Sequence, residues 1–349
     1  MAAYISFQPK DFYNTTAYQA TGATLNITSP GFQPDFVWIK TRNHTNSHCL
    51  FNSRQGATKV LRSNNDAVTA TAADTLTSFD STGFTLGADA SGYGVNYSSS
   101  DEQISWNWKM GTTTGIDTTG SDITPTSYSF NQDAGYSVIL YPGSGNDDLL
   151  PHGLGKVPQL VIIRATDTVK YWMCYSEFTG NAKEFYLNGS NAAGSSGTWN
   201  TTTPTSVNIS LDPGGGNGVN TSGTNYVGYF FTSKPGCTKV GGYVGNGNAD
   251  GTFVYTGFRP AFLMVKCTSH AEPWLTWDDK RIAYNVKNWR LMPNQTVVEN
   301  ESEEIDLLSN GFKFRGSGAH LNGSGREYVY LACAKFPIVS SNSKAGTAR

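Results

Sequence analysis

Three short apolar runs, each led by a proline, recur along this chain and constrain its fold more than any other feature. They are Pro34–Lys40 (PDFVWIK), Pro158–Arg164 (PQLVIIR) and Pro260–Lys266 (PAFLMVK). A short continuous apolar run is typical of a strand that is buried on both faces. The leading proline fits the start of a strand, where its missing N–H breaks no ladder hydrogen bond. Self-similarity at a fixed period indicates a repeated structural unit.

Further features keep the same order around each run. A tyrosine-then-glycine turn precedes the run, a hairpin pattern follows it, and an alternating aromatic strand closes each copy. Asn310-Gly311 between alternating apolar residues is the strongest hairpin signal in the chain. The turns begin at Tyr18, Tyr141 and Tyr243; the hairpin patterns are Leu76–Gly87, the weaker Thr205–Leu211 and Ile305–Phe314; the closing strands are Ile104–Lys109, Tyr226–Phe231 and Tyr328–Cys333.

This order predicts an all-β protein of three tandem β-sandwich or jelly-roll-like repeats, each of roughly 105 residues, with very little helix. Short helical pieces are expected only near Asn65–Asp74 and Val298–Leu307. Each repeat closes its own core or shares sheets with a neighbour, and the pattern leaves both open. The predicted boundaries are repeats at 1–111, 127–236 and 237–338, a Thr/Gly-rich linker at 112–126 and a C-terminal tail at 339–349.

The composition excludes several functions. Charged residues make up 15% of the chain and the formal net charge is −2, with no basic stripe of the kind that binds nucleic acid. No apolar run approaches the roughly 18 residues of a membrane-spanning helix. The first residues show no secretory signal, so synthesis in a cytoplasm is expected. The five cysteines are widely spaced and without a CxxC motif, and we interpret them as small buried apolar residues.

Several segments carry a resemblance to a known family. They are Gly31–Arg42, Leu50–Lys59 with Leu61–Asn64, Leu76–Gly87, His152–Gly155, Trp199–Ser206 and Tyr255–Phe262. In these segments the chain resembles repeats of tail-fibre-like virion proteins from marine bacteriophages, which are described as having a concanavalin A-like (lectin/glucanase-type) jelly-roll fold. The family usually has an acidic residue where Asn52 stands. The resemblance implies a place in a virion and a surface glycan as ligand, and it assigns no binding residue.

The sequence offers only weak candidates for catalytic residues. Glycoside hydrolysis needs two carboxyl groups roughly 5–9.5 Å apart across a cleft, and adjacent residues on a strand point to opposite faces. The acidic pairs are therefore interpreted as solvated charges, and the five histidines as polar loop residues, so no catalytic residue, metal or cofactor is predicted. The pairs are Asp147-Asp148, Asp278-Asp279 and Glu303-Glu304; the histidines are His44, His48, His152, His270 and His320.

Aromatic side chains are the remaining candidates for a site, because they present a large rigid surface to the C–H face of a sugar. Trp274 and Trp277 flank the turn-like Glu272-Pro273 and are the best candidates for exposure. Core packing is the alternative for any one of these tryptophans. The candidate glycan-binding residues are Trp274, Trp277, Trp172 and Trp199, with Trp289 outside the closing strands as well.

These observations predict a non-enzymatic virion structural protein of tail-fibre or spike type that attaches to host-surface glycans. An architectural capsid or tail decoration protein without a ligand is the first alternative, and a glycan-degrading virion enzyme is the second, since a fold does not determine a function. The expected partners are other virion proteins, a host cell-surface glycan and further copies of the chain, with a trimer favoured for fibres and spikes. Neither nucleic acid nor membrane insertion is expected.

Overall fold

The computed structural model describes residues 8–214, 218–282, 284–336, 338–339 and 345–346. As predicted, the fold is all-β, built from antiparallel sheets. Helix is confined in these residues to a 3-10 turn (Pro9–Asp11) and α1 (Ala319–Asn322). Both helical expectations are wrong, because Asn65–Asp74 contains only the short strand β6 and Val298–Leu307 overlaps strand β24. In the latter segment Ile305 and Leu307 alternate with polar residues, which is the period of a strand.

The first third of the chain forms two facing sheets. The larger has the strand order β1-β9-β3-β4-β5-β6 and the smaller β2-β8-β7. The hairpin predicted at Leu76–Gly87 is present as β7 and β8. The strands are β1 (Tyr13–Gln19), β2 (Leu25–Ile27), β3 (Phe36–Thr41), β4 (Cys49–Asn52), β5 (Lys59–Arg62), β6 (Ala70–Thr71), β7 (Leu76–Asp80), β8 (Gly83–Leu86) and β9 (Glu102–Trp108).

The middle third repeats this strand order. Its large sheet runs β10-β11-β18-β13-β14-β15-β16, so that β11, β18, β13, β14 and β15 stand where β1, β9, β3, β4 and β5 stand in the first third. The second sheet is only the pair β12-β17. The strands are β10 (Ser127–Asn131), β11 (Tyr136–Pro142), β12 (Asp148–Pro151), β13 (Leu160–Ala165), β14 (Met173–Ser176), β15 (Lys183–Tyr186), β16 (Gly194–Ser195), β17 (Asn208–Leu211) and β18 (Asn225–Phe231).

The last third has the same order again, β19-β26-β21-β22, with β23 now at the edge of the second sheet, β20-β25-β24-β23. A short pair, β27 with β28, lies in the predicted tail, whose residues 340–344 and 347–349 are outside the described part. The strands are β19 (Thr238–Val244), β20 (Phe253–Tyr255), β21 (Arg259–Cys267), β22 (Trp274–Asp278), β23 (Lys287–Arg290), β24 (Asn300–Leu308), β25 (Gly311–Phe314), β26 (Glu327–Phe336), β27 (Ile338–Val339) and β28 (Ala345–Gly346).

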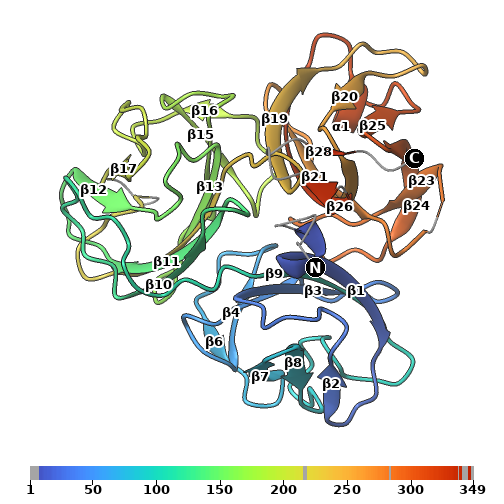
Figure 1. Ribbon diagram of the computed structural model, residues 1–349, viewed down its shortest axis with the longest axis horizontal. Helices are drawn as coiled ribbons and strands as arrows, with labels where there is room; N and C mark the ends of the chain where they lie inside the picture. The colour runs from blue at the N-terminus through green and yellow to red at the C-terminus, as the bar shows by residue number, and fades with distance from the viewer. Residues whose placement is uncertain (1–7, 215–217, 283, 337, 340–344, 347–349) are drawn as a thin grey trace, which may run out of the picture.

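We call these three bodies unit 1 (β1–β9), unit 2 (β10–β18) and unit 3 (β19–β26). Figure 1 shows them as three lobes around a common centre, with unit 1 in blue, unit 2 in green and unit 3 in orange. The predicted linker, 112–126, contains no strand and leads from unit 1 to unit 2. The exact domain limits stay a prediction.

The three proline-led strands each serve two cores at once. In β3, Phe36 and Trp38 belong to a central cluster, while Val37 and Ile39 belong to the core between the two sheets of unit 1. The same alternation recurs in β13 and β21. Burial on both faces explains why these runs are continuously apolar. The question left open by the sequence is resolved, because each unit has its own core and all three share a fourth.

A tyrosine and an asparagine secure the same corner of every unit. The hydroxyl of Tyr18 donates to the carbonyl of Val95 at 2.8 Å, and the next residue, Asn96, accepts the N–H of Thr21 at 2.7 Å. Both bonds recur at the corresponding positions of units 2 and 3. The recurrent tyrosine noticed in the sequence is therefore structural. The corresponding pairs are Tyr141 with Asn220, and Tyr243 with Asn322.

Candidate functional site

The four tryptophans proposed for glycan binding are all buried, with exposed fractions of 0–1%. The expected exposure of Trp274 and Trp277 is therefore wrong. Trp199 and Trp277 lie in the cores of units 2 and 3. Trp172 and Trp274 lie in the central core, and neither presents a face that a sugar could reach. Trp289 is half-buried, and its ring is covered by the Arg42 guanidinium at 5.6 Å.

Trp172 and Trp274 join neighbouring units. We call the contact between two units a seam. In seam 1–2, Trp172 Nε1 donates to the carbonyl of Arg62 at 3.0 Å. In seam 2–3, Trp274 Nε1 donates to the carbonyl of Tyr186 at 2.8 Å. Arg62 and Tyr186 are the last residues of β5 and β15, so the two bonds are equivalent. These indoles therefore satisfy strand-end carbonyls of the adjacent unit.

The seams close as a ring. One backbone hydrogen bond occurs at the same place in each: Thr69 N–H to the carbonyl of Thr166, Ala193 N–H to that of Thr268, and Glu299 N–H to that of Arg42, at 2.8, 2.8 and 2.7 Å. Each joins the loop after a proline-led strand (β3, β13 or β21) to a neighbouring unit. The third bond links unit 3 to unit 1, which completes the circle.

Each proline-led strand (β3, β13 and β21) has a buried cation as its last residue but one, and these cations lie at the seams. Arg164 Nη2 donates to the carbonyl of Ala67 at 2.8 Å in seam 1–2, and Lys266 Nζ to that of Ser190 at 3.3 Å in seam 2–3. Lys40 bonds the carbonyls of Thr41 and His44 within unit 1. Burial lowers the pKa of Lys40 and of Lys266 to about 8. These groups are enclosed structural cations.

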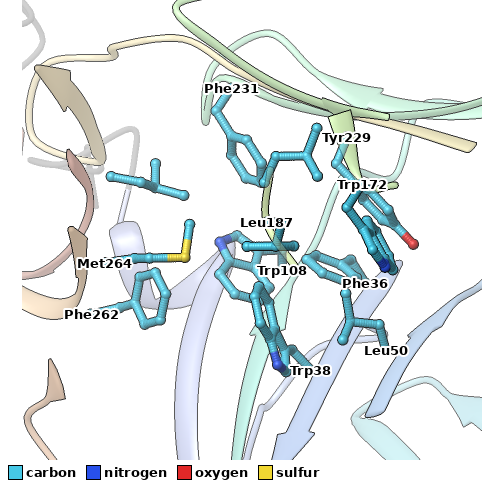
Figure 2. Close-up of a pocket in the computed structure, with 12 residues that line it drawn as sticks. Phe36, Trp38, Leu50, Trp108, Trp172, Leu187, Tyr229, Phe231, Phe262 and Met264 are labelled. Atoms are coloured by element: carbon cyan, nitrogen blue, oxygen red, sulfur yellow. The ribbon is translucent and has the colours of Figure 1, made fainter. Parts of the chain in front are cut away.

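The central core leaves almost no free space. Figure 2 shows the side chains around its one small cavity, which come from all three units. Its volume is about 10 Å³ and its lining is entirely apolar. A cavity needs at least roughly 10–15 Å³ to hold a single water, and that water needs polar partners. The space is a packing gap and offers no ligand site.

Asp278 and Asp279 are both buried in ion pairs, so their interpretation as solvated charges is wrong. Asp278 is buried and bonds the Arg281 guanidinium at 2.7 Å, and it accepts the Trp106 N–H at 3.2 Å. Burial alone would raise the pKa of Asp278, but the Arg281 charge and nearby N–H donors hold it below its ordinary value. Asp279 pairs with Lys335 at 2.5 Å. The side chains of Glu303 and Glu304 lie outside the described part.

The histidines are placed in different settings. His48 is fully buried in seam 3–1, where desolvation and then the nearby cations lower its pKa well below the ordinary value. His152 is buried too, and desolvation lowers its pKa to about 4. Both lie in loops, as interpreted, but they are buried. His44 is exposed and lies 3.3 Å from Asp101. Among the described residues, no group of three or more His, Cys, Asp or Glu could hold a metal ion.

The five cysteines are all buried and unpaired, as predicted. Burial raises the pKa of Cys49 and of Cys333 to about 12. At neutral pH these thiols are protonated and poor nucleophiles. No helix in the described part of the chain is long and apolar enough to cross a membrane.

Two surface hollows remain as places where a ligand could enter. The hollow of unit 2 is a wide polar depression of about 430 Å³ without an aromatic side chain; it is lined by Gly155, Lys156, Val157, Gln159, Glu177, Ser206, Thr232 and Ser233. The hollow of unit 1 has a volume of about 230 Å³ and combines an arginine, a tyrosine and two serines; it is lined by Ser47, Arg62, Ser91, Gly92 and Tyr93. Sequence reasoning missed both.

Fold and sites together define a class of protein: a one-chain assembly of three two-sheet units with a common aromatic core. Buried cations lie at its seams. The chain belongs to the family described as Domain of unknown function (DUF7483), whose model matches residues 8–337 in a single span. That span covers all three units and their shared core. Neither a curated protein nor a solved structure is found to match the chain.

Proposed function

We propose that this chain is a non-enzymatic structural protein of a bacteriophage virion, of tail-fibre or spike type, which attaches to glycans on the host surface. The proposal is supported by the sequence resemblance and by one structural observation. That observation is the hollow of unit 1, where the Arg62 guanidinium and the Tyr93 ring lie together, 5.8 Å apart, at the surface of a tightly packed body. Aromatic rings and hydrogen-bonding side chains in a preformed hollow are the usual means of recognising a sugar.

The rigid setting strengthens this proposal. Apart from the half-buried Trp289, the tryptophans are buried in the cores and seams, as are the cysteines and most strongly shifted ionisable groups. They serve the scaffold, which leaves the surface hollows for recognition. A preformed site loses little conformational entropy on binding, so even a small contact area contributes useful affinity.

The test is a glycan array probed with the purified chain. We expect saturable binding to a subset of glycans, and no signal from chain that has been heat-denatured. Immunogold labelling of intact particles with an antibody to the chain tests the virion location in parallel. Absence of the chain from particles, or absence of any glycan signal, would contradict the corresponding part of the proposal.

The architectural alternative is favoured by one specific observation. The three similar units of the chain are arranged around one centre (Figure 1). This arrangement suits a position of threefold symmetry on a particle. A decoration protein of this kind would sit in the particle and give no glycan signal. The expected trimer stays a prediction, and light scattering of the purified chain would measure its mass.

The enzymatic alternative is tested by incubating host polysaccharide with the chain and measuring polymer length. Shortening that persists in the Asp278→Asn, Glu303→Gln and Glu304→Gln variants would show that other residues carry the activity. Unchanged polymer length supports the non-enzymatic proposal.

A further inference from the structure

The hollow of unit 1 is built from three segments that are fixed independently. Ser47 comes from the β3–β4 loop, Arg62 from the end of β5, and Ser91–Tyr93 from the loop before β9. Ser47 Oγ accepts an N–H of Asn64 at 3.2 Å. The walls are therefore held in place without a ligand, which is the condition for a preorganised site.

Two aspartates secure the third segment. The buried Asp89 carboxylate accepts the N–H groups of Tyr93 and Val95 at 2.9 and 2.6 Å. Asp74 accepts both the N–H and the hydroxyl of Ser91, at 3.0 and 2.5 Å. Gly92, between Ser91 and Tyr93, adopts a left-handed conformation with φ of 75°, which glycine reaches without strain. The loop that carries Tyr93 therefore has a defined shape.

Arg62 is the charged residue among those that line this hollow, and its guanidinium lies over the Tyr93 ring. No ion pair among the described residues includes Arg62. Its counterparts in units 2 and 3, placed by the same strand pairing, are Tyr186 and Met292, neither of which is a cation. The Tyr186 hydroxyl bonds Glu184 at 2.7 Å. Unit 1 alone therefore offers a guanidinium at this position to an outside partner.

We infer that this hollow binds one acidic monosaccharide residue of a glycan, with its carboxylate on Arg62 and its ring against Tyr93. This inference rests on the proposed function and specifies its ligand. A guanidinium matches a carboxylate with two parallel N–H···O bonds, and the hydroxyls of Ser47 and Ser91 lie in the same hollow for the sugar hydroxyls. The volume of about 230 Å³ is below the range of roughly 300–1,000 Å³ for drug-sized ligands, which fits a single sugar ring.

The experiment is a pair of NMR titrations of the full chain with methyl β-glucuronide and methyl β-glucoside. These sugars differ only in a carboxylate against a hydroxymethyl group. We expect the glucuronide to bind with a dissociation constant of about 1 mM, as its number of atoms allows, and the glucoside to bind at least about tenfold more weakly. Raising the salt concentration weakens glucuronide binding, because the attraction is between charges.

Arg62→Gln should weaken glucuronide binding about tenfold or more, and Tyr93→Ala should weaken both sugars. Lys59→Gln is the matched control, since it removes the same charge from the same strand but outside the hollow. Tyr97→Ala is the control for Tyr93, because Tyr97 is an exposed tyrosine of the same loop. Neither control should change binding, and far-ultraviolet circular dichroism verifies the fold of every variant.

The outcomes separate this inference from the proposed function. Equal binding of the two sugars, or glucuronide binding that Arg62→Gln and Tyr93→Ala leave unchanged, would overturn the inference. Glycan-array binding that persists in the Arg62→Gln variant would place the glycan site elsewhere and leave the proposed function intact. No binding in either assay would overturn both.

Discussion

The seam between units 3 and 1 differs from the other two. In seams 1–2 and 2–3 a tryptophan, Trp172 directly before β14 or Trp274 at the start of β22, donates to a carbonyl of the neighbour. In seam 3–1 the corresponding residue is His48, stacked on Trp106 with ring centroids 6.3 Å apart. A chain of charges accompanies it: Arg42 pairs with Glu299 at 2.5 Å, Glu299 with Arg281 at 3.4 Å, and Arg281 with Asp278 at 2.7 Å.

The difference follows from chain connectivity. Units 1 and 2, and units 2 and 3, are consecutive in the chain, whereas units 3 and 1 are separated by the whole of unit 2. A buried ion network contributes little net stability over apolar packing, but leaving one member unpaired costs about 3–5 kcal/mol. The charged seam therefore disfavours any arrangement in which unit 3 meets the wrong surface. Seams 1–2 and 2–3 join units that the chain already holds close.

Removing the apolar part of seam 3–1 should have the largest effect. Phe262 of unit 3 contacts Trp106 and Trp108 of unit 1, with ring centroids 5.5 Å apart in both cases. Phe262→Ala is expected to lower the free energy of unfolding in urea by about 3–5 kcal/mol, because it leaves a cavity in the central core. Phe253→Ala, an exposed position of the same unit, is the control and should change it by less than about 0.5 kcal/mol. A loss below about 1 kcal/mol for Phe262→Ala would contradict a shared core.

Breaking the ion pairs of seam 3–1 should have the second largest effect on stability. Asp278→Asn leaves the buried Arg281 guanidinium without the nearer of its two carboxylate partners, and the expected loss is about 3 kcal/mol. Asp306→Asn is the matched control, because Asp306 pairs with the partly exposed Arg315 outside the seams; it should cost at most about 1 kcal/mol. Equal losses in urea denaturation would show that seam 3–1 does not depend on its charges.

Seams 1–2 and 2–3 are tested by removing one indole N–H. Trp274→Phe should cost about 1 kcal/mol, the usual net contribution of a hydrogen bond, and more if the Tyr186 carbonyl is left unsatisfied. Trp199→Phe loses an equivalent bond to the Lys183 carbonyl at 3.1 Å, within unit 2. Hydrogen exchange distinguishes the two: only Trp274→Phe should speed exchange of the Ala193 amide. Faster exchange of that amide in Trp199→Phe would contradict the assignment of Trp274 to the seam.

A smaller effect is expected from pH. The folded-state pKa of Lys40 and Lys266 is about 8, below the ordinary value near 10.4. At these two lysines the unfolded chain therefore binds more protons above pH 8, and their contribution to stability should rise between pH 8 and 9 by about 1 kcal/mol each. The buried thiols, whose folded-state pKa values are raised above the ordinary value near 8.5, act in the opposite direction over the same range. The lysine contribution is therefore measured as a difference: between pH 8 and 9, urea denaturation should give a stability change about 2 kcal/mol more positive in the chain than in a Lys40→Met, Lys266→Met variant. An equal change in the chain and the variant would contradict it.

The two-faced burial of the central strands could be predicted from sequence, because a continuous apolar run carries its own signal. The same holds for the hairpin at Ile305–Phe314, where Asn310-Gly311 specifies the turn. The apolar run does not show that the Lys or Arg at its end is buried. Arg164 is satisfied by the carbonyls of Asp66 and Ala67, almost one hundred residues away in the chain, and no local pattern records such a partner.

The tryptophan prediction failed for the same reason. A proline and a glutamate beside Trp274 suggested an exposed turn, but its burial is determined by Tyr186 of another unit, 88 residues earlier. The hollow of unit 1 was missed because its walls come from three separate segments, and each of them is unremarkable alone. Asn52, noted as a departure from an acidic residue, instead bonds the Tyr229 hydroxyl at 3.1 Å across seam 1–2.

Differential scanning calorimetry of the intact chain tests the shared core most directly. If the three units form one cooperative body, a single endotherm is expected, with a van't Hoff enthalpy close to the calorimetric enthalpy. Separate endotherms, or a van't Hoff enthalpy near one third of the calorimetric value, would show that the units unfold independently and that the central cluster does not couple them.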